Sequence, residues 1–562
     1  MIDDGIVSCK AINMGRLFYI VLASVSLQIG CSSSDSDSLS SSASEYGLTE
    51  KPYTSLQQVW VPNEPSPEVR AMMDDGTFTV YQHPQYAGNG LGARLESGLP
   101  WIEHLELAPN FAAQGAQRSS LAYILVIADP QIIDEESPIR MDGYANVYRP
   151  GGQLTPQVFE ANIRTARRIS DRSSRPFDFA IIAGDLTDTS QKNELDWMIT
   201  ALNGGVIDPD SGVDDDPIPG PGNDYNDPFL AIGIESPWYV ALGNHDVLHV
   251  GGFGLIDNTL RDAAQGDHLF TGSNFSKIWG GYVAGDTADH QVVLDASVTT
   301  PPDPARIPLN ETELLQTLYE AGGAPAGHGY SPEDIAAQKS YYSVYPVADK
   351  PIRMVVLDST DAAKNTPLGS MDEHQFTWLH EELVSAADQH ELVIVVSHHR
   401  LQDFDDKSKV SGEMVKDLLV SSDNVILHLT GHGHRDRKSL QTANGEGGFW
   451  ELMTTSTIDF PMQSRVLELV DENNGYLSIY VTNVGHNSAA TTLASKARQL
   501  AAGKLAFGTT FFDGDTVAFW EDEVQAQNLL LRVALPDDIS SNLATISDWP
   551  DTIESIHTLS HF

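Results

Sequence analysis

Five short motifs rich in aspartate, asparagine and histidine follow one another along the chain. Carboxylate, amide and imidazole side chains are the groups that bind divalent cations such as Mn, Fe, Zn and Mg. Together the motifs offer enough ligand atoms for two adjacent ions, an arrangement typical of phosphate-ester hydrolysis. In chain order they are Asp129-Pro-Gln131, Gly184-Asp185-Leu-Thr-Asp188, Gly243-Asn244-His245-Asp246, Ser397-His398-His399 and Gly431-His432-Gly433-His434.

Each motif directly follows a run of apolar, β-prone residues. Such runs predict buried strands, and apolar residues at helical spacing in 157–172 and 374–387 predict helices between them. Alternating strands and helices indicate an α/β architecture, which gathers ligands at the carboxyl ends of its strands. We therefore expect the motifs to share one site. The predicted strands are residues 123–128, 179–183, 238–242, 353–357, 392–396 and 425–429.

In the order and spacing of these motifs, the sequence resembles the calcineurin-like metallophosphoesterase superfamily over roughly residues 123–484. The ordered Gly-Asp-x-x-Asp, Gly-Asn-His-Asp and Gly-His-x-His motifs make the resemblance specific. It implies a four-layer α/β/β/α sandwich of two mixed sheets, with the site at their edge. It also implies a hydrolase that cleaves phosphate esters with two divalent metal ions, whose identity (Mn, Fe, Zn or Mg) the sequence leaves open.

The resemblance assigns expected roles to the motif residues. A hydroxide bridging the two metals would attack phosphorus, and His245 would protonate the leaving oxygen while Asp188 orients its ring. Of two neighbouring histidines, His398 is the expected ligand because it directly ends a strand, and His399 lies beside it. The expected metal ligands are Asp129 and His434 for the first ion, Asn244, His398 and His432 for the second, and Asp185 for both.

Two departures from the family pattern bear on metal and substrate. Gln131 stands where most members have a metal-binding histidine, so it is either a weak oxygen ligand that favours Mn or Mg, or a supporting residue that does not touch metal. A similar Asp-Pro-Gln occurs in a branch that resembles the manganese-dependent ADP-ribose/CDP-alcohol diphosphatases. In the protein phosphatases an arginine directly after Gly-Asp-x-x-Asp binds the phosphate of a monoester. Thr189 and Ser190 stand there in this chain, which favours a diester, a pyrophosphate or a small-molecule monoester as substrate. Arg400 could bind the phosphate from another loop instead.

Two other functions stay open beside the hydrolase. A metal-binding scaffold whose catalysis has lapsed through Gln131 is the main alternative, although retention of the proton donor His245 argues against it. A nucleotidase with a separate nucleotide-binding domain is disfavoured, because residues 500–562 are few and hold no aromatic pair suited to clamp a base.

The chain of 562 residues has 33 Lys and Arg against 78 Asp and Glu, a formal net charge of -45. Such a surface repels nucleic acids and anionic membranes, so we expect a small-molecule or phosphoester substrate and no nucleic-acid docking surface. The two cysteines, Cys9 and Cys31, exclude a disulfide framework in the folded body. Nothing in the sequence indicates the oligomeric state.

The N-terminal residues have the layout of a bacterial secretory signal. Met14 offers a second start, followed by Arg16, an apolar run over 17–29 and then Gly30 before Cys31. This ending resembles a lipobox, with Gln28 where leucine is usual, and predicts a lipid on Cys31 as the membrane tether. The alternatives are a plain cleaved signal and an uncleaved anchor, and the apolar run is shorter than the ~20 residues that an anchor needs to span a bilayer. The pattern predicts export, to the periplasm or the cell surface.

The organisation expected along the chain follows from these features. The segments are a signal peptide at 1–30, a Ser-rich tether at 31–45, an N-terminal extension at 46–120, the phosphoesterase domain at 121–485 with insertions at 203–227 and 251–329, and a C-terminal extension at 486–562.

Overall fold

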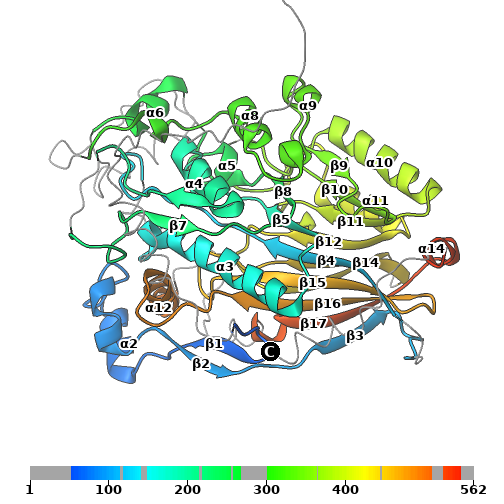
Figure 1. Ribbon diagram of the computed structural model, residues 1–562, viewed down its shortest axis with the longest axis horizontal. Coiled ribbons are helices and arrows are strands. Elements are labelled where there is room, and N and C mark those ends of the chain that lie inside the picture. The colour runs from blue at the N-terminus through cyan, green and yellow to red at the C-terminus, as the bar shows by residue number, and fades with distance from the viewer. Residues whose placement is uncertain are drawn as a thin grey trace, which may run out of the picture.

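The computed structural model describes residues 52–113, 118–140, 148–213, 218–254, 257–267, 300–361, 363, 365–443, 446–508 and 523–545. The predicted signal peptide, the tether and Cys31 lie outside the described residues, as does much of the predicted insertion 251–329. At the centre of the described part, two mixed sheets stack face to face (Figure 1).

The first sheet has seven strands in the order β3-β17-β16-β15-β4-β5-β8. β4, β5 and β8 are parallel to one another, and β15 joins them antiparallel to β4. The bounds are β3 (Ile102–Leu107), β4 (Ser119–Ile127), β5 (Phe179–Ala183), β8 (Trp238–Ala241), β15 (Gln463–Asp471), β16 (Tyr476–Gly485) and β17 (Asn528–Ala534).

The second sheet has six strands in the order β13-β14-β12-β11-β10-β9. Its four inner strands are parallel, and the edge strands β9 and β13 are antiparallel to their neighbours. The bounds are β9 (Tyr342–Val344), β10 (Ile352–Val356), β11 (Leu392–Val396), β12 (Val425–Thr430), β13 (Arg437–Ala443) and β14 (Glu446–Met453).

The continuous apolar runs of the inner strands exist because both of their faces are buried. In β10, Met354 and Val356 face the core between the two sheets, whereas Val355 packs with Leu379 and Leu383 of a covering helix. Successive side chains of a strand point to opposite faces, so a strand covered on both faces needs apolar residues at every position. This confirms the predicted four-layer α/β/β/α class.

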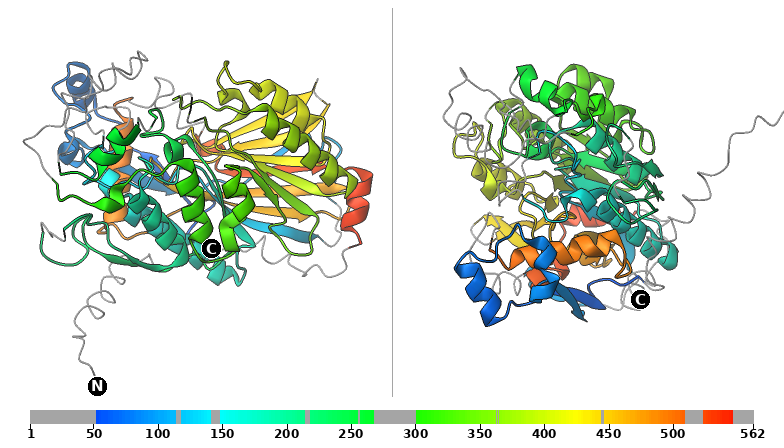
Figure 2. Two further views of the ribbon diagram at one scale, coloured as in Figure 1. Left: turned by 90° about the horizontal axis from the view of Figure 1, so that it is seen from above. Right: turned by 90° about the vertical axis from the view of Figure 1, so that its left-hand side faces the viewer.

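Helices cover the outer face of each sheet (Figure 2). α3 (Thr155–Ser173), α4 (Lys192–Asn203) and α12 (Leu493–Leu505) lie on the side of the seven-stranded sheet, and α10 (Glu373–Asp388) and α11 (Gly412–Val420) cover the other. Further helices lie in the loops. They are α2 (Pro67–Asp74), α5 (Asn244–Val247), α6 (Asp257–Ala264), α8 (Glu311–Glu320), α9 (Pro332–Ala336) and α14 (Asp537–Leu543).

Strands from both flanking segments take part in the seven-stranded sheet. β3 precedes residue 120 and pairs in parallel with β17, which follows residue 485. β1 (Gln58–Pro62) and β2 (Ala93–Ser97) form a separate ribbon, and β6 (Gly205–Ile207) pairs with β7 (Phe229–Ala231). The domain limits at 120 and 485 stay a prediction. Within the described residues, no helix is long and apolar enough to cross a membrane.

Candidate metal centre

The motif residues meet at one edge of the two sheets. Asp129 and Asp185 lie two residues past the ends of β4 and β5, and His398 and His432 lie two residues past β11 and β12. These strands run parallel within their sheets, so their carboxyl ends open at a common edge. Asn244 begins the short helix α5 directly after β8 and the Leu242-Gly243 link.

Asp129, Asp185 and His398 place their ligand atoms within 4.8 Å of one another. His398 Nε2 is 3.2 Å from Asp185 Oδ2 and 3.9 Å from Asp129 Oδ1. His398 Nδ1 lies 2.8 Å from the backbone oxygen of Ala183. A ring that donates from Nδ1 to a carbonyl presents the lone pair of Nε2 to the cluster.

Asn244 directs its amide oxygen into the same cluster. Asn244 Oδ1 is 3.0 Å from His398 Nε2 and 3.1 Å from His432 Nδ1. At its other end the amide is fixed, because Asn244 Nδ2 donates to the backbone oxygen of Gly251 at 2.8 Å. Asn244, in the short helix that follows a strand of the first sheet, therefore converges with His398 and His432, which lie in two loops of the second sheet.

His434 lies on the Asp129 side of the cluster. His434 Nε2 is 3.3 Å from Asp129 Oδ1, and His434 Nδ1 is 2.7 Å from Asp459 Oδ2. Asp459 also pairs with Arg149 Nε, at 2.9 Å. Nothing in the spacing of the sequence motifs marks Asp459, which lies in the loop between β14 and β15.

The amide of Gln131 supports Asp185 in this structure. Gln131 Nε2 donates to Asp185 Oδ2 at 3.1 Å, and the same carboxylate accepts at Oδ1 from the backbone N–H of His245 at 2.8 Å. In this geometry Gln131 holds the carboxylate of Asp185 through its amide nitrogen.

His245 and Asp188 lie side by side at the rim. His245 Nδ1 is 2.9 Å from the backbone oxygen of Asp188 and 3.4 Å from its Oδ1. Burial lowers the pKa of His245, but the carboxylates of Asp185 and Asp188 outweigh it, so the pKa lies above its ordinary value. The arrangement suits a ring that carries a proton and is held in one orientation.

The neighbours of these residues have structural partners of their own. Both ring nitrogens of His399 have protein neighbours, Ser359 Oγ at 2.9 Å and the oxygen of Pro367 at 3.0 Å. Asp246 accepts from the backbone N–H groups of Leu186 and Gly243, each at 2.8 Å. It thereby joins the loop after β5 to the loop after β8.

The backbone at the centre is held in an uncommon conformation. Asp129, Gln131, Asp185, His432 and His434 all have positive φ angles, between 40° and 68°. Such angles cost free energy for residues with a Cβ and persist where surrounding contacts impose them, most often at functional sites. The strained backbone is therefore consistent with a functional site at this cluster.

The buried donor atoms fit a cation. Asp129 and Asp185 are fully buried, and in the described part of the chain their ion-pair partners are histidines. Burial alone would lower the pKa of His398, yet Asp185 raises it to about 9; Asp129 and Asp459 likewise raise that of His434 to about 9 against the effect of burial. The cluster thus attracts positive charge, and the mix of carboxylate oxygens and imidazole nitrogens suits divalent metals.

The family model for calcineurin-like phosphoesterases matches residues 122–436, more than half of the chain. The chain belongs to the calcineurin-like phosphoesterase family. It is accordingly a hydrolase that acts on phosphate ester bonds, and the match spans all five motifs. No curated protein sequence matches the chain.

Several solved structures of phosphoesterases are similar in part. A dimetal phosphatase from Danio rerio is 12% identical with a TM-score of 0.36, over 65% of this chain and 99% of that one. A purple acid phosphatase from yellow lupin is 13% identical with a TM-score of 0.30, over 70% of this chain and 53% of that one. A 5'-nucleotidase precursor from Thermus thermophilus is 13% identical with a TM-score of 0.29, over 68% of this chain and 59% of that one. The chain thus spans little more than half of the last two, and such low scores support no conclusion about substrate.

Arg400, the arginine that the sequence offers for holding a phosphate, is ion-paired within its own loop. Arg400 pairs with Asp403 through two contacts of 2.8 and 2.9 Å. Arg140 instead lies against Asp188, with Nη1 3.2 Å from Asp188 Oδ2. A single arginine in a loop carries no sequence signal, so its position emerges only from the fold.

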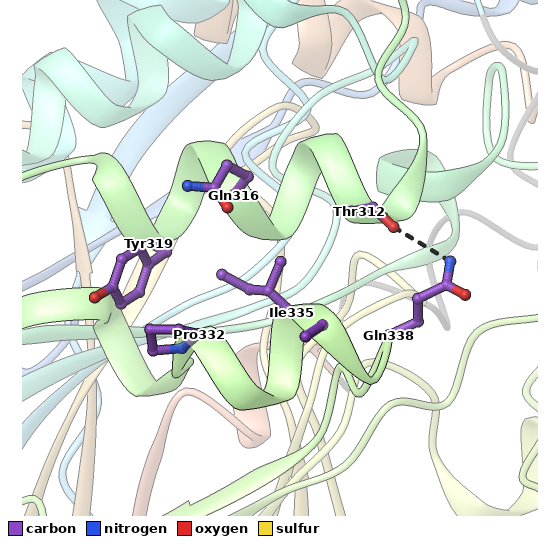
Figure 3. A pocket seen from close by; sticks show the side chains of 7 residues that line it. Thr312, Gln316, Tyr319, Pro332, Ile335 and Gln338 are labelled. Atoms are coloured by element: carbon purple, nitrogen blue, oxygen red, sulfur yellow. Dashed lines mark hydrogen bonds between the residues drawn. The ribbon is translucent and has the colours of Figure 1, made fainter.

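A groove with a volume of about 500 Å³ lies elsewhere, between α8 and α9 (Figure 3). Gln338 Nε2 donates to Thr312 Oγ1 at one end of it, at 3.2 Å, and Ile335 and Tyr319 line it. Its lining shares no residue with the five motifs. The phosphoesterase chemistry therefore belongs to the motif cluster, where the ligand atoms converge, and not to this groove.

Proposed function

We propose that the protein hydrolyses a phosphate ester at a centre of two divalent metal ions. Bound there, the ions would neutralise phosphoryl charge and activate a water for attack. The observation that carries the proposal is the convergence of Asp129, Asp185 and His398, whose ligand atoms lie within 4.8 Å of one another in one buried cluster. The proposed ligands are Asp129 and His434 for the first ion, Asn244, His398 and His432 for the second, and Asp185 for both.

We assign Gln131 to the same centre. As placed, its amide nitrogen holds Asp185. A half-turn of the amide would exchange the nitrogen for Oε1, a neutral oxygen ligand that suits Mn or Mg better than Zn. Metal identity is best decided by adding each of Mn, Fe, Zn and Mg to the metal-free protein.

His245 is proposed as the group that protonates the leaving oxygen. Asp188 holds His245 Nδ1, which leaves Nε2 to carry the proton that is transferred. Asp188 acts through orientation and through stabilisation of the imidazolium. The substrate class we propose is a diester, a pyrophosphate or a small-molecule monoester.

The test compares two model esters. The purified protein is stripped of metal, reloaded with each ion, and assayed on p-nitrophenyl phosphate and bis-p-nitrophenyl phosphate. We expect metal-restored hydrolysis that Asp185→Asn abolishes, and the preferred ester separates monoester from diester. Metal binding without turnover of either ester, or of ADP-ribose, would favour the alternative of a scaffold with lapsed catalysis.

We also propose that the protein is exported and tethered by a lipid on Cys31. The support is the sequence pattern of Met14 to Cys31, which lies outside the described residues. In a bacterial host, the protein should incorporate labelled fatty acid and sediment with membranes, and Cys31→Ser should abolish both. Incorporation that persists in Cys31→Ser would refute the lipid site.

A further inference from the structure

Asp188 lies between His245 and a buried arginine. Arg140 Nη1 donates to Asp188 Oδ2 at 3.2 Å, and His245 Nδ1 is 3.4 Å from Asp188 Oδ1. The side chains of Arg140, Asp188 and His245 are only 5, 10 and 14% exposed. The Asp188 carboxylate thus lies between an arginine and the proposed proton donor, whose Nδ1 is also 2.9 Å from the backbone oxygen of Asp188.

The position of Arg140 is fixed from several directions. Its Nε pairs with Glu135 Oε2 at 3.2 Å, and its backbone N–H donates to the oxygen of Ser137 at 3.2 Å. Gly152 leaves room for the guanidinium, because a Cβ at Gly152 would lie 2.8 Å from Arg140 Nη2. An arginine held in this way can hold its carboxylate partner in turn.

The loop that carries Arg140 is anchored to the body of the protein. Asp134 N donates to Glu194 Oε1 at 3.2 Å, and Ser137 Oγ donates to Gln191 Oε1 at 2.8 Å. Gln191 and Glu194 begin helix α4, which follows Asp188 directly in the chain. Both ends of the Arg140–Asp188 contact are therefore attached to the same helix start.

We propose that Arg140 is a positioning residue for the reaction, an inference that rests on the proposed function. Arg140 holds the Asp188 carboxylate, and through it the His245 ring, in the orientation that delivers the leaving-group proton. In that step the water oxygen forms a bond to phosphorus and the bond from phosphorus to the leaving oxygen breaks. The released electron pair stays on the leaving oxygen, which takes the proton from His245 Nε2, and the proton that the attacking water loses to solvent balances the one that returns to His245 from solvent.

A positioning role of this kind affects only reactions that need the proton. A p-nitrophenolate leaves without protonation, whereas a more basic phenolate or alkoxide depends on it. Without Arg140, the Asp188 carboxylate would no longer be held in place. The His245 ring would then no longer be oriented toward the leaving oxygen. A merely structural role for Arg140 would instead slow all esters by the same factor.

The experiment measures kcat and KM of the metal-loaded protein on phenyl and p-nitrophenyl esters of the same phosphate. We expect Arg140→Met to lower kcat on the phenyl ester by about 10- to 100-fold and on the p-nitrophenyl ester by less than about 3-fold. KM and metal content should not change. Arg140→Lys should recover part of the loss, since it restores the charge without the planar fork.

Two further variants keep the test decisive. Gly152→Ala would displace the guanidinium of Arg140 without removing it. It should slow the phenyl ester more than the p-nitrophenyl ester, by a smaller factor than Arg140→Met does. This variant keeps the test possible if Arg140→Met does not fold. Arg353→Met is the matched control, because Arg353 is also buried and ion-paired, with Glu382 at 2.8 Å, at the opposite end of a strand from the centre. It should leave the ratio of the two ester rates unchanged.

The role of His245 is tested separately by His245→Ala. If it slows only the phenyl ester, and Arg140→Met adds no further loss in that background, the proposal holds. Equal slowing of both esters by Arg140→Met, or an additive loss in the His245→Ala background, would overturn it. Equal slowing of both esters by His245→Ala would instead refute the proton-donor part of the proposed function.

Discussion

At the scale of single residues, Asn244 and His245 depend on the main chain of the loop that follows them. Gly251 accepts from Asn244 Nδ2 at 2.8 Å and has a φ of +67°. A Cβ at this position would overlap Asn244 Nδ2 and lie 2.5 Å from His245 Nε2. Glycine is therefore required here for space as well as for conformation.

Gly251→Ala should lower kcat by at least about 10-fold, because small displacements of catalytic groups are costly. Gly252→Ala is the matched control, since a Cβ at Gly252 would meet nothing within 4 Å. The kcat of ester hydrolysis is compared between the two variants, after checking that both bind the same amount of metal and unfold at the same temperature. Similar activity of the two variants would show that the loop does not fix the centre.

Residues of the centre differ in whether the sequence could predict them. Asp185, Asn244 and His432 were predictable because each lies in a motif with a fixed place after a strand. Arg140 and Asp459 were not, because they reach the centre from long loops in which no spacing relates them to the motifs. A carboxylate that holds a histidine of the centre, as Asp459 holds His434, leaves no local signature when it comes from another part of the chain.

At the scale of elements, Arg306 ties two predicted insertions to the loop after β4. Its side chain is fully buried and donates to Asp134 Oδ2 at 3.0 Å and to the backbone oxygen of Ser211 at 2.9 Å. Asp134 begins the loop that leads to Arg140. The two predicted insertions therefore help to hold the loop that carries Asp134 and Arg140.

Arg306→Met should destabilise the protein by about 3–5 kcal/mol, because it leaves the Asp134 carboxylate buried without its partner. Arg261→Met is the comparison, since the Arg261–Glu313 pair at 3.0 Å is partly exposed and such pairs contribute about 0–1 kcal/mol. Denaturant unfolding at one pH measures both. Equal losses of stability would contradict the account of Arg306 as a clamp.

Helix α12 carries a second test, of pH dependence. Burial and the nearby Arg149 lower the pKa of Lys504 to about 7, and Asp459 only partly opposes them. Between pH 7 and about 10 the unfolded chain holds a proton that the folded protein lacks, so this residue makes the free energy of unfolding rise with pH. The rise is at most about 1.4 kcal/mol per pH unit.

Lys504→Met should remove this rise, while Lys496→Met, at an exposed position on the same helix, should keep it. Thermal midpoints at pH 7, 8 and 9 give the comparison. A midpoint difference between wild type and Lys504→Met that does not change with pH would refute the assignment.

At the scale of the whole molecule, the sequence predicted β4, β5, β8, β10, β11 and β12 but not the other strands of the two sheets. Runs such as those of β5 and β11 are apolar throughout because both faces are covered. β15 lacks such a continuous apolar run, because it contains Arg465 and Glu468. Both are buried with partners that are distant in the chain: Arg465 pairs with Asp436, and Glu468 accepts from Ser120. Pairing of β3 with β17 joins residues that are far apart in the chain, which no local pattern can foresee.

If the five motifs form one centre for two metal ions, crystals of the manganese-loaded protein should reveal both ions by anomalous X-ray diffraction. We expect two anomalous peaks about 3.5–4 Å apart, one on each side of the Asp185 carboxylate. A single peak, or a pair of peaks that Asp185 does not join, would contradict it.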